Sequence, residues 1–223
     1  MGKIKIKKND VWIDMTPMSD VMVLLLTFFM LSANFVKNEV VKVVTPASQT
    51  MAKVPSSATL DITIDPEGRV LVATDKTVTM EKALEQMLRE RETTLTADQK
   101  KAFLAETQIG VPVKNLPQYL DMTHEEQVKV LKTTGIPTDS MQTREDKMSE
   151  FQLWVKAMKN GYKEWYNDLS DADKTEVSAT KLEICIKADK QTPYSAVKMV
   201  IAELQDINES RYKLVTQYKK LEE

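Results

Sequence analysis

Apolar residues form one long run near the N-terminus, and shorter periodic patterns follow it along the rest of the chain. The run covers residues 17–36. As a helix, a run of about 20 residues spans roughly 30 Å, which is enough to cross the core of a bilayer. Thr16 suits the N-cap of this helix, and Pro17 suits its first position. The pattern therefore predicts a transmembrane helix over residues 17–36.

Lysines predict the orientation of this helix. Four of them precede the apolar run, whereas only Lys37 follows it directly. The positive-inside rule then places residues 1–16 in the cytoplasm and the rest of the chain in the periplasm of a cell with two membranes. A cleaved signal peptide would also have a basic start and an apolar core. Against that alternative, Pro17 and Asp20 interrupt the core, and Leu31-Ser32-Ala33 is a poor cleavage site.

Asp20 is the one ionisable residue of this run. An ionisable group inside a membrane helix costs several kcal/mol, so it rarely persists without a task. Its carboxyl group can take up and release protons, which makes proton-driven work the first functional hypothesis. The alternative is a carboxylate that only complements the helix dipole or lies at the headgroup level. Thr27, Ser32 and Asn34 favour protein-lined or wet surroundings for this helix over bare lipid.

Residues 37–58 are predicted to be a linker, because they contain Pro46, Pro55 and several Ser and Thr residues. Within it, residues 40–44 (Val-Val-Lys-Val-Val) have the composition of a strand. A short extended segment of this kind can pair with another chain by strand addition. A plain tether is the alternative.

Two strands and a helix are predicted after the linker. Residues 60–64 alternate apolar and polar positions, as a half-buried strand does. The sequence Asp65-Pro-Glu-Gly68 is typical of a type I turn, and residues 69–73 form the returning strand. Thr79 is then expected to cap a helix that ends near Glu92.

A similar pattern returns near the C-terminus. Residues 182–187 alternate in the same way and predict a strand, with Cys185 on its polar side as a buried, inert thiol. Pro193 opens a helix that runs to about Ile207, and residues 211–218 have the pattern of a closing strand.

The predicted fold is therefore a single N-terminal transmembrane helix followed by a small α+β domain, with helices on one face of a sheet. Residues 59–92 and 178–223 supply this domain. Between them, residues 93–177 form a large helical insertion. Capping boxes at Thr96 and Thr123 start two of its helices. A third helix is expected over residues 144–169, with its aromatic and apolar stripe forming part of a core: Phe151, Trp154, Val155, Met158, Tyr162 and Trp165.

Composition excludes several classes of function. The net charge of −2 gives no long-range field that would attract nucleic acid, and a single cysteine cannot form an intrachain disulfide. There is no glycine-rich phosphate loop. His124 is the only histidine, so histidine-based metal sites and catalytic triads lack their parts. We expect no enzyme activity, no cofactor and no metal.

Residues 13–30, Ile-Asp-Met-Thr-Pro-Met-Ser-Asp-Val-Met-Val-Leu-Leu-Leu-Thr-Phe-Phe-Met, resemble the membrane signature of the ExbD/TolR family of biopolymer transport proteins. The specific part is Thr-Pro-x-x-Asp before a run of Leu and Phe. The segment from Val41 to Pro46 resembles the short extended motif of that family, and residues 187–194 resemble its strand-to-helix junction. The resemblance covers about residues 3–91 and 177–223.

This resemblance implies roles for particular residues. Asp20 matches the proton-carrying carboxylate, and Thr16, Pro17 and Thr27 belong to the membrane-helix motif. The extended motif pairs with the partner protomer of a homodimer through a short series of positions: Val41, Lys42, Val43 and Pro46. In the family, two such helices lie inside a pentameric ring of an ExbB/TolQ-like membrane protein. Their motion passes to a TonB- or TolA-like energy transducer.

The leading hypothesis is an inner-membrane subunit of a motor driven by the proton-motive force, energising TonB-dependent transport across the outer membrane. A TolR-like role in envelope integrity is the nearest alternative. A signal-anchored periplasmic module that binds peptidoglycan or a partner, with Asp20 inert, is an alternative from another class. A flagellar-type stator subunit ranks third, because the chain shows no large peptidoglycan-binding domain of the kind those subunits carry. No role is predicted for the insertion at residues 93–177.

Overall fold

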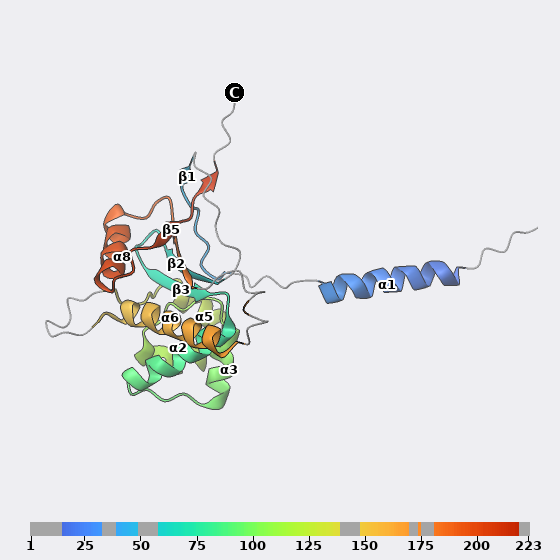
Figure 1. Cartoon of the computed structure of the whole chain (residues 1–223), viewed down its shortest axis with the longest axis horizontal. Coiled ribbons are helices and arrows are strands. Elements are labelled where there is room, and N and C mark those ends of the chain that lie inside the picture. Colours follow the sequence, from blue (N-terminus) through green and yellow to red (C-terminus); the bar gives the residue numbers. More distant parts are fainter. Residues whose placement is uncertain are drawn as a thin grey trace, which may run out of the picture. The chain divides into compact units, whose positions relative to one another are not determined.

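A computed structural model of the chain describes residues 15–32, 39–48, 58–138, 148–169, 174 and 181–218. The chain divides into two compact units, residues 1–37 and residues 38–223. The first unit contains the helix α1, and the second contains the other labelled elements (Figure 1).

Helix α1 spans Thr16–Ser32 and begins one residue before the predicted start. A shift of this size is within the usual uncertainty of a helix end. The last part of the predicted transmembrane segment, residues 33–36, lies outside the described residues. Within the part of the chain that the structure describes, no helix combines the length and the apolarity needed to cross a membrane.

A sheet of four strands lies at the centre of the second unit. In spatial order its strands are β3 (Val70–Thr74), β2 (Thr59–Ile64), β4 (Glu183–Ala188) and β5 (Tyr212–Leu214). The strand β2 pairs antiparallel with β3 and parallel with β4, and β4 pairs parallel with β5. The predicted strands near residues 60–64, 69–73 and 182–187 are thus confirmed within one or two residues.

The last predicted strand, residues 211–218, is in fact two strands. After β5 the chain leaves the large sheet, and β6 (Gln217–Tyr218) pairs parallel with β1 (Ala47–Ser48). The short strand of the linker therefore falls at Ala47 and Ser48. Residues 40–44, whose composition predicted a strand, belong to no strand in this structure.

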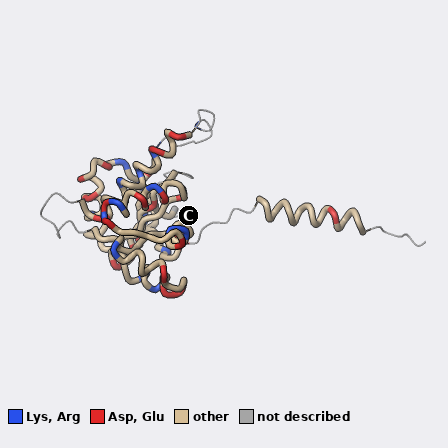
Figure 2. Tube along the Cα trace, turned by 90° about the horizontal axis from the view of Figure 1, so that it is seen from below, with Lys and Arg blue, Asp and Glu red and all other residues tan. Residues whose placement is uncertain are grey.

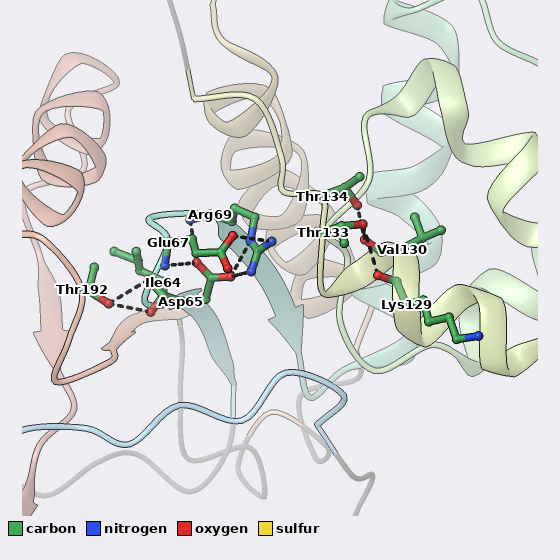
Figure 3. A network of polar contacts seen from close by, with 9 residues as sticks. All are labelled: Ile64, Asp65, Glu67, Arg69, Lys129, Val130, Thr133, Thr134 and Thr192. Carbon is green, nitrogen blue, oxygen red and sulfur yellow. Dashed lines mark hydrogen bonds and ion pairs between the residues drawn. The ribbon is translucent and has the colours of Figure 1, made fainter.

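The turn between β2 and β3 has the predicted place. The backbone N–H of Gly68 donates to the carbonyl of Asp65 at 3.0 Å, and Gly68 has a φ of +84°, which a glycine adopts without strain. The Asp65 carboxylate accepts hydrogen bonds from the backbone N–H groups of Glu67 and Arg69 at 2.9 Å each. It also pairs with the Arg69 side chain, and the Thr192 hydroxyl donates to the Asp65 carbonyl at 2.9 Å (Figure 3). These contacts join the turn to the start of the C-terminal helix.

Helix α2 spans Thr77–Glu90 and helix α8 spans Tyr194–Asp206. The prediction that Thr79 caps the first of these helices is wrong, because α2 begins two residues earlier and Thr79 lies buried inside it. The apolar face of α2 packs on the core, as the spacing of its apolar residues predicts. Ala83, Leu84, Met87 and Leu88 are buried there.

The predicted insertion contains α3 (Ala97–Ala105), the short 3-10 helix η1 (Val113–Asn115), α4 (Leu116–Leu120), α5 (His124–Leu131) and α6 (Glu150–Asp168). Both predicted capping boxes are present, at Thr96 with Gln99 and at Thr123 with Glu126. A third box, at Ser149, starts α6. The first part of the predicted third helix, residues 144–147, lies outside the described residues.

Helix α6 packs along α2 and supplies much of the core (Figure 1). The predicted aromatic stripe is confirmed as core for five of its members, which are buried: Phe151, Trp154, Val155, Met158 and Tyr162. The sixth, Trp165, is half-buried, and the Lys76 ammonium lies 5.4 Å from the centroid of one of its rings. Phe103 of α3 stacks on Trp154 at 6.1 Å between ring centroids. Buried residues of the strands and of the helical segment form one hydrophobic cluster, so one core unites the sheet domain and the helical segment.

The prediction that helices cover one face of the sheet holds only in part. Side chains alternate between the two faces of a strand, so Leu71 points away from the face of Val70 and Val72. All three are buried. A Cβ added at Gly110 would meet the side chains of Leu71 and Leu131, so the segment from α3 to α5 covers the second face beside β3. The helical segment also closes the free edge of β3, where Ile109 and Val72 exchange two backbone hydrogen bonds.

Candidate functional site: a carboxylate on an apolar helix and the segment that follows it

Asp20 is the fifth residue of α1 and its only charged residue. The helix begins at Thr16, so Asp20 lies beyond the first turn, where the attraction of a helix N-terminus for a carboxylate has largely faded. This weakens the alternative in which Asp20 serves only as a helix-start residue. Figure 2 shows α1 as a tan helix with a single red position.

Most other side chains of α1 are apolar, and the helix is exposed on all sides. Eleven large apolar residues of α1 are exposed in the isolated chain: Met18, Val21, Met22, Val23, Leu24, Leu25, Leu26, Phe28, Phe29, Met30 and Leu31. A helix that is apolar all round is buried in its working environment, by lipid or by other helices. Asp20 is therefore the one charged side chain on a largely apolar, exposed helix.

Thr27 lies on the same face of α1 as Asp20. The two residues are seven positions apart, which is nearly two full turns and roughly 10 Å of rise. The Thr27 hydroxyl donates to the carbonyl of Leu24 at 2.9 Å, and the Ser19 hydroxyl donates to that of Met15 at 3.0 Å. Both hydroxyl groups thus have hydrogen-bond acceptors within the backbone of α1 itself. They do not require the wet or protein-lined surroundings that the sequence suggested for Thr27.

Thr16 and Pro17 open α1 as its first two residues, so Pro17 occupies the second position and Thr16 the first. Thr16 was predicted to be the N-cap, but it is the first residue of the helix. Pro17 lies in the first turn as predicted, where its missing N–H group would have had no partner in the helix.

The second part of the candidate site is the segment that we call the strap, residues 39–48. Its side chains alternate over part of its length: Val41, Val43 and Thr45 are half-buried, and Lys42, Val44 and Pro46 are exposed. The strap is thus an extended segment lying on the second unit of its own chain. The predicted pairing of Val41, Lys42, Val43 and Pro46 with a partner protomer stays a prediction.

Val41 is held by the side chain of Gln108, which lies between α3 and η1. The Val41 N–H donates to Gln108 Oε1 at 2.8 Å, and Gln108 Nε2 donates to the Val41 carbonyl at 3.2 Å. Gln108 is 2% exposed. The side-chain amide of Gln108 therefore pairs with the backbone of Val41 in the way that a residue of a neighbouring strand would.

Val44 and Pro46 are held by the C-terminal part of the domain. The Val44 N–H donates to Asp189 Oδ2 at 2.7 Å, and the Lys190 N–H donates to the Val44 carbonyl at 2.8 Å. The Gln217 N–H donates to the Pro46 carbonyl at 3.0 Å. Hydrogen bonds from the N–H groups of Gln191 and Val44 lower the pKa of Asp189, so its carboxylate stays charged.

Lys187 ties the start of the strap to the sheet. Its ammonium lies 2.8 Å from Glu39 Oε1 and 2.9 Å from Asp61 Oδ2. Burial lowers the pKa of Lys187, but its hydrogen bonds to Glu39 and Asp61 outweigh this effect and the net pKa is raised. The Lys187 side chain therefore stays positively charged beside Glu39, the first residue of the strap.

A groove of about 400 Å³ lies beside the strap, lined by Glu39, Val40, Ala105, Glu106, Thr107, His124 and Val128. Burial raises the pKa of Glu106, although the nearby His124 lowers it in part. The buried Tyr119 hydroxyl makes no hydrogen bond of ordinary geometry, yet burial and the Glu106 carboxylate raise its pKa strongly. The His124 side chain is exposed at the first position of α5.

Metal and thiol chemistry find little support in the part of the chain that the structure describes. No group of three or more His, Cys, Asp or Glu side chains is arranged there to hold a metal ion. Cys185 is fully buried, and burial together with the neighbouring Asp61 and Glu183 raises its pKa to about 11. The prediction of a buried thiol is confirmed.

Gln108 and Asp189 are the residues of this site that the sequence did not reveal. Asp189 stands in the strand-to-helix junction that resembles the family motif, but no role was predicted for it. Gln108 stands in a charged helical segment with no pattern that singles it out. Because 67 residues separate it from Val41, local sequence patterns carry no signal for this pair.

Comparison with known proteins places the chain in a family. Searches of curated proteins and of solved structures found no significant match. A family model described as biopolymer transport protein ExbD/TolR matches residues 7–167, which include α1, the strap and much of the predicted insertion. Members of this family are generally anchored in the inner membrane and work with ExbB/TolQ-type partners in complexes that energise biopolymer transport. The chain belongs to the ExbD/TolR family of biopolymer transport proteins.

Proposed function

We propose that this chain is a single-pass inner-membrane subunit of a motor driven by the proton-motive force, which energises TonB-dependent transport across the outer membrane. In this proposal α1 is the described part of the membrane helix, and the apolar sequence continues to Val36. Residues 1–16 lie in the cytoplasm, and the second unit lies in the periplasm. A pentameric ExbB/TolQ-like protein surrounds two copies of α1.

The observation that carries the proposal is Asp20, a lone carboxylate on a helix whose other large side chains are apolar and exposed. A charged carboxylate in such surroundings is costly, whereas a protonated one is tolerated. Gain and loss of one proton therefore changes how well α1 packs in its surroundings. That change is the step by which proton flow could do mechanical work.

The energy available matches such a step. One elementary charge that crosses a potential of 100 mV releases about 2.3 kcal/mol. A bias of about 2.3 kcal/mol shifts an equilibrium between two helix packings by almost fiftyfold. Protonation of Asp20 at one face and release at the other would thus drive α1 between two positions in the ring. The second unit would pass this motion to a TonB-like transducer.

Asp20→Asn tests the proposal, because asparagine keeps the shape of the side chain and removes its titratable proton. The variant is expressed in the native host, with uptake of an outer-membrane transport substrate as the readout. Protein level and co-purification of the ExbB/TolQ-like partner serve as controls. We expect uptake to be lost while the complex still assembles.

Asp20→Glu is the matched variant, since it keeps a titratable carboxyl group on the same face of α1. We expect it to retain part of the uptake that Asp20→Asn loses. Full uptake with Asp20→Asn would instead support the anchored periplasmic module that binds peptidoglycan or a partner, with no proton role for Asp20.

The TolR-like alternative predicts a different loss. If Asp20→Asn leaves uptake intact but releases periplasmic proteins into the medium, the motor serves envelope integrity and a TolA-like transducer. The same strain therefore separates the two branches of the family.

A further inference from the structure

The strap connects the N-terminal unit to the domain, yet it does not hang free. Its ten residues, 39–48, lie along the second unit and make polar contacts at several points. Val40 and Val41 also pack against the hydrophobic core. In the described structure the strap is therefore part of the folded domain.

Gln108 supplies the first of two main attachment points. Its amide satisfies both the N–H and the carbonyl of Val41. Gln108 lies in the helical segment between β3 and β4, after α3. The adjoining Ile109 is fixed to β3 by the backbone hydrogen bonds between its own main chain and Val72. The position of Gln108 is thus tied to the sheet itself.

Asp189 and Lys190 supply the second attachment point, after β4. The Asp189 side chain and the Lys190 N–H bond to the two main-chain polar groups of Val44. Val44 itself is 61% exposed, so its side chain adds little to this attachment. The two points hold main-chain positions of the strap that lie three residues apart, and both use a side chain as a substitute for part of a neighbouring strand.

We propose that Gln108 and Asp189 form a two-point latch that holds the strap on the domain and thereby limits how far the domain can move from its membrane anchor. Each point consists of a few separate hydrogen bonds, made by a side chain at one point and by a side chain and a backbone N–H at the other, rather than a continuous ladder. The strap can therefore leave both points without unfolding the sheet. A released strap of ten residues can span up to about 35 Å between the anchor and the domain. The limit on the movement of the domain rests on the proposed function, because it requires α1 to lie in a membrane. The attachment of the strap by Gln108 and Asp189 does not depend on a membrane.

Hydrogen–deuterium exchange of the full chain in detergent tests the latch. The measured quantity is the exchange rate of the peptides that cover residues 39–48. Gln108→Ala should speed exchange at Val41 by about tenfold or more, because it removes two hydrogen bonds from a locally opening segment. Asp189→Ala should do the same at Val44. The double variant should speed exchange along the whole strap.

Gln205→Ala is the matched control, since Gln205 is an exposed glutamine on α8 far along the sequence from the strap. It should leave exchange in the strap unchanged, and peptides of β2 should remain protected in every variant. Unchanged exchange at both Val41 and Val44 in the double variant would overturn the latch. Loss of protection throughout β2 would also overturn it, because the contacts would then belong to the global fold.

A distance measurement tests the effect on reach. A fluorophore at Lys198→Cys, an exposed position on α8, reports the distance to acceptor-labelled lipids in vesicles that hold the full chain. Energy transfer should fall in the double variant and stay unchanged in Gln205→Ala. Equal transfer in all three proteins would overturn the limit on reach. Failure of the chain to float with the vesicles would contradict the proposed membrane anchor instead.

Discussion

The hydroxyl of Ser149 donates to Glu203 Oε2 at 2.5 Å, and both residues are buried. Ser149 is the N-cap of α6, and Glu203 belongs to α8. The side-chain amide of Gln152 also donates to the Glu203 carbonyl at 3.1 Å. One buried carboxylate therefore joins the start of the long helix in the predicted insertion to the C-terminal helix of the sheet domain.

Ser149→Ala should destabilise the domain by more than the loss of an ordinary cap. The cap is worth about 1 kcal/mol, and leaving the buried Glu203 carboxyl group without this hydrogen bond costs roughly 1–3 kcal/mol more. We expect a loss of about 2–4 kcal/mol in the free energy of unfolding, measured by urea denaturation of the full chain in detergent. Thr96→Ala is the control, because Thr96 caps α3 through the same kind of box but is exposed. Equal losses for the two variants would contradict a structural role for Glu203.

Trp154 should be among the most costly core residues to truncate. It is fully buried and stacks on Phe103, so Trp154→Ala should lower the free energy of unfolding by about 3–5 kcal/mol. Trp165→Ala offers the comparison, since Trp165 is half-buried and its contact with Lys76 is worth about 0.5–1 kcal/mol. Thermal unfolding of the two variants gives the ranking. A larger loss for Trp165→Ala would contradict the central place of Trp154 in the core.

Local signals in the sequence predicted the parts of the fold that depend on neighbouring residues. The two capping boxes at Thr96 and Thr123, the turn at Gly68 and the alternation in β2 all lie within a few positions of the contacts they make. The same reasoning failed at Thr79, where α2 begins two residues before the expected cap and has Lys76, which makes no side-chain capping hydrogen bond, at its N-cap.

Long-range contacts explain what could not be predicted. Val44 and Asp189 are 145 positions apart, and no periodicity links them. The valine-rich composition of residues 40–44 indicated an extended segment, which is the conformation found, but not the surface on which it lies. At Asp20 the sequence was more informative than the fold, because the functional argument needs only one carboxylate in an apolar run.

Glu150 should make stability depend on pH. Its carboxylate accepts a hydrogen bond from the Val113 N–H at 2.7 Å, and burial raises its pKa even though Val113 and Arg91 lower it in part. A raised carboxyl pKa stabilises the fold at a pH below the unfolded value of about 4.3, and this stabilisation is lost as the pH rises through the folded value. Glu150→Gln keeps an acceptor and removes the charge. Its stability relative to the natural chain should therefore be greater at pH 7 than at pH 4.5.

Glu150→Ala is the companion variant, since it leaves the Val113 N–H without an acceptor at either pH. We expect it to cost about 1–3 kcal/mol at pH 7. The cost should be larger at pH 4.5, where the natural chain gains the stability of the protonated carboxyl group. Thermal melts of the three proteins at both pH values provide the measurement. If the difference between Glu150→Gln and the natural chain does not change with pH, the buried carboxyl group titrates as an ordinary one.

Cys185 should react slowly with alkylating reagents in the folded chain. Its pKa of about 11 leaves about one thiolate in a thousand at pH 8, whereas an ordinary cysteine with a pKa near 8.5 has about one in four. Its side chain is also fully buried, which denies access to the reagent. Labelling with iodoacetamide at pH 8, followed by mass spectrometry, should thus be more than a hundredfold slower in the folded chain than in the chain unfolded in about 8 M urea. An added cysteine at the exposed Ser195 controls for reagent quality in the folded state. Rapid labelling of Cys185 beside that control would show that β4 opens readily, and with it the Lys187 and Asp189 contacts that hold the strap.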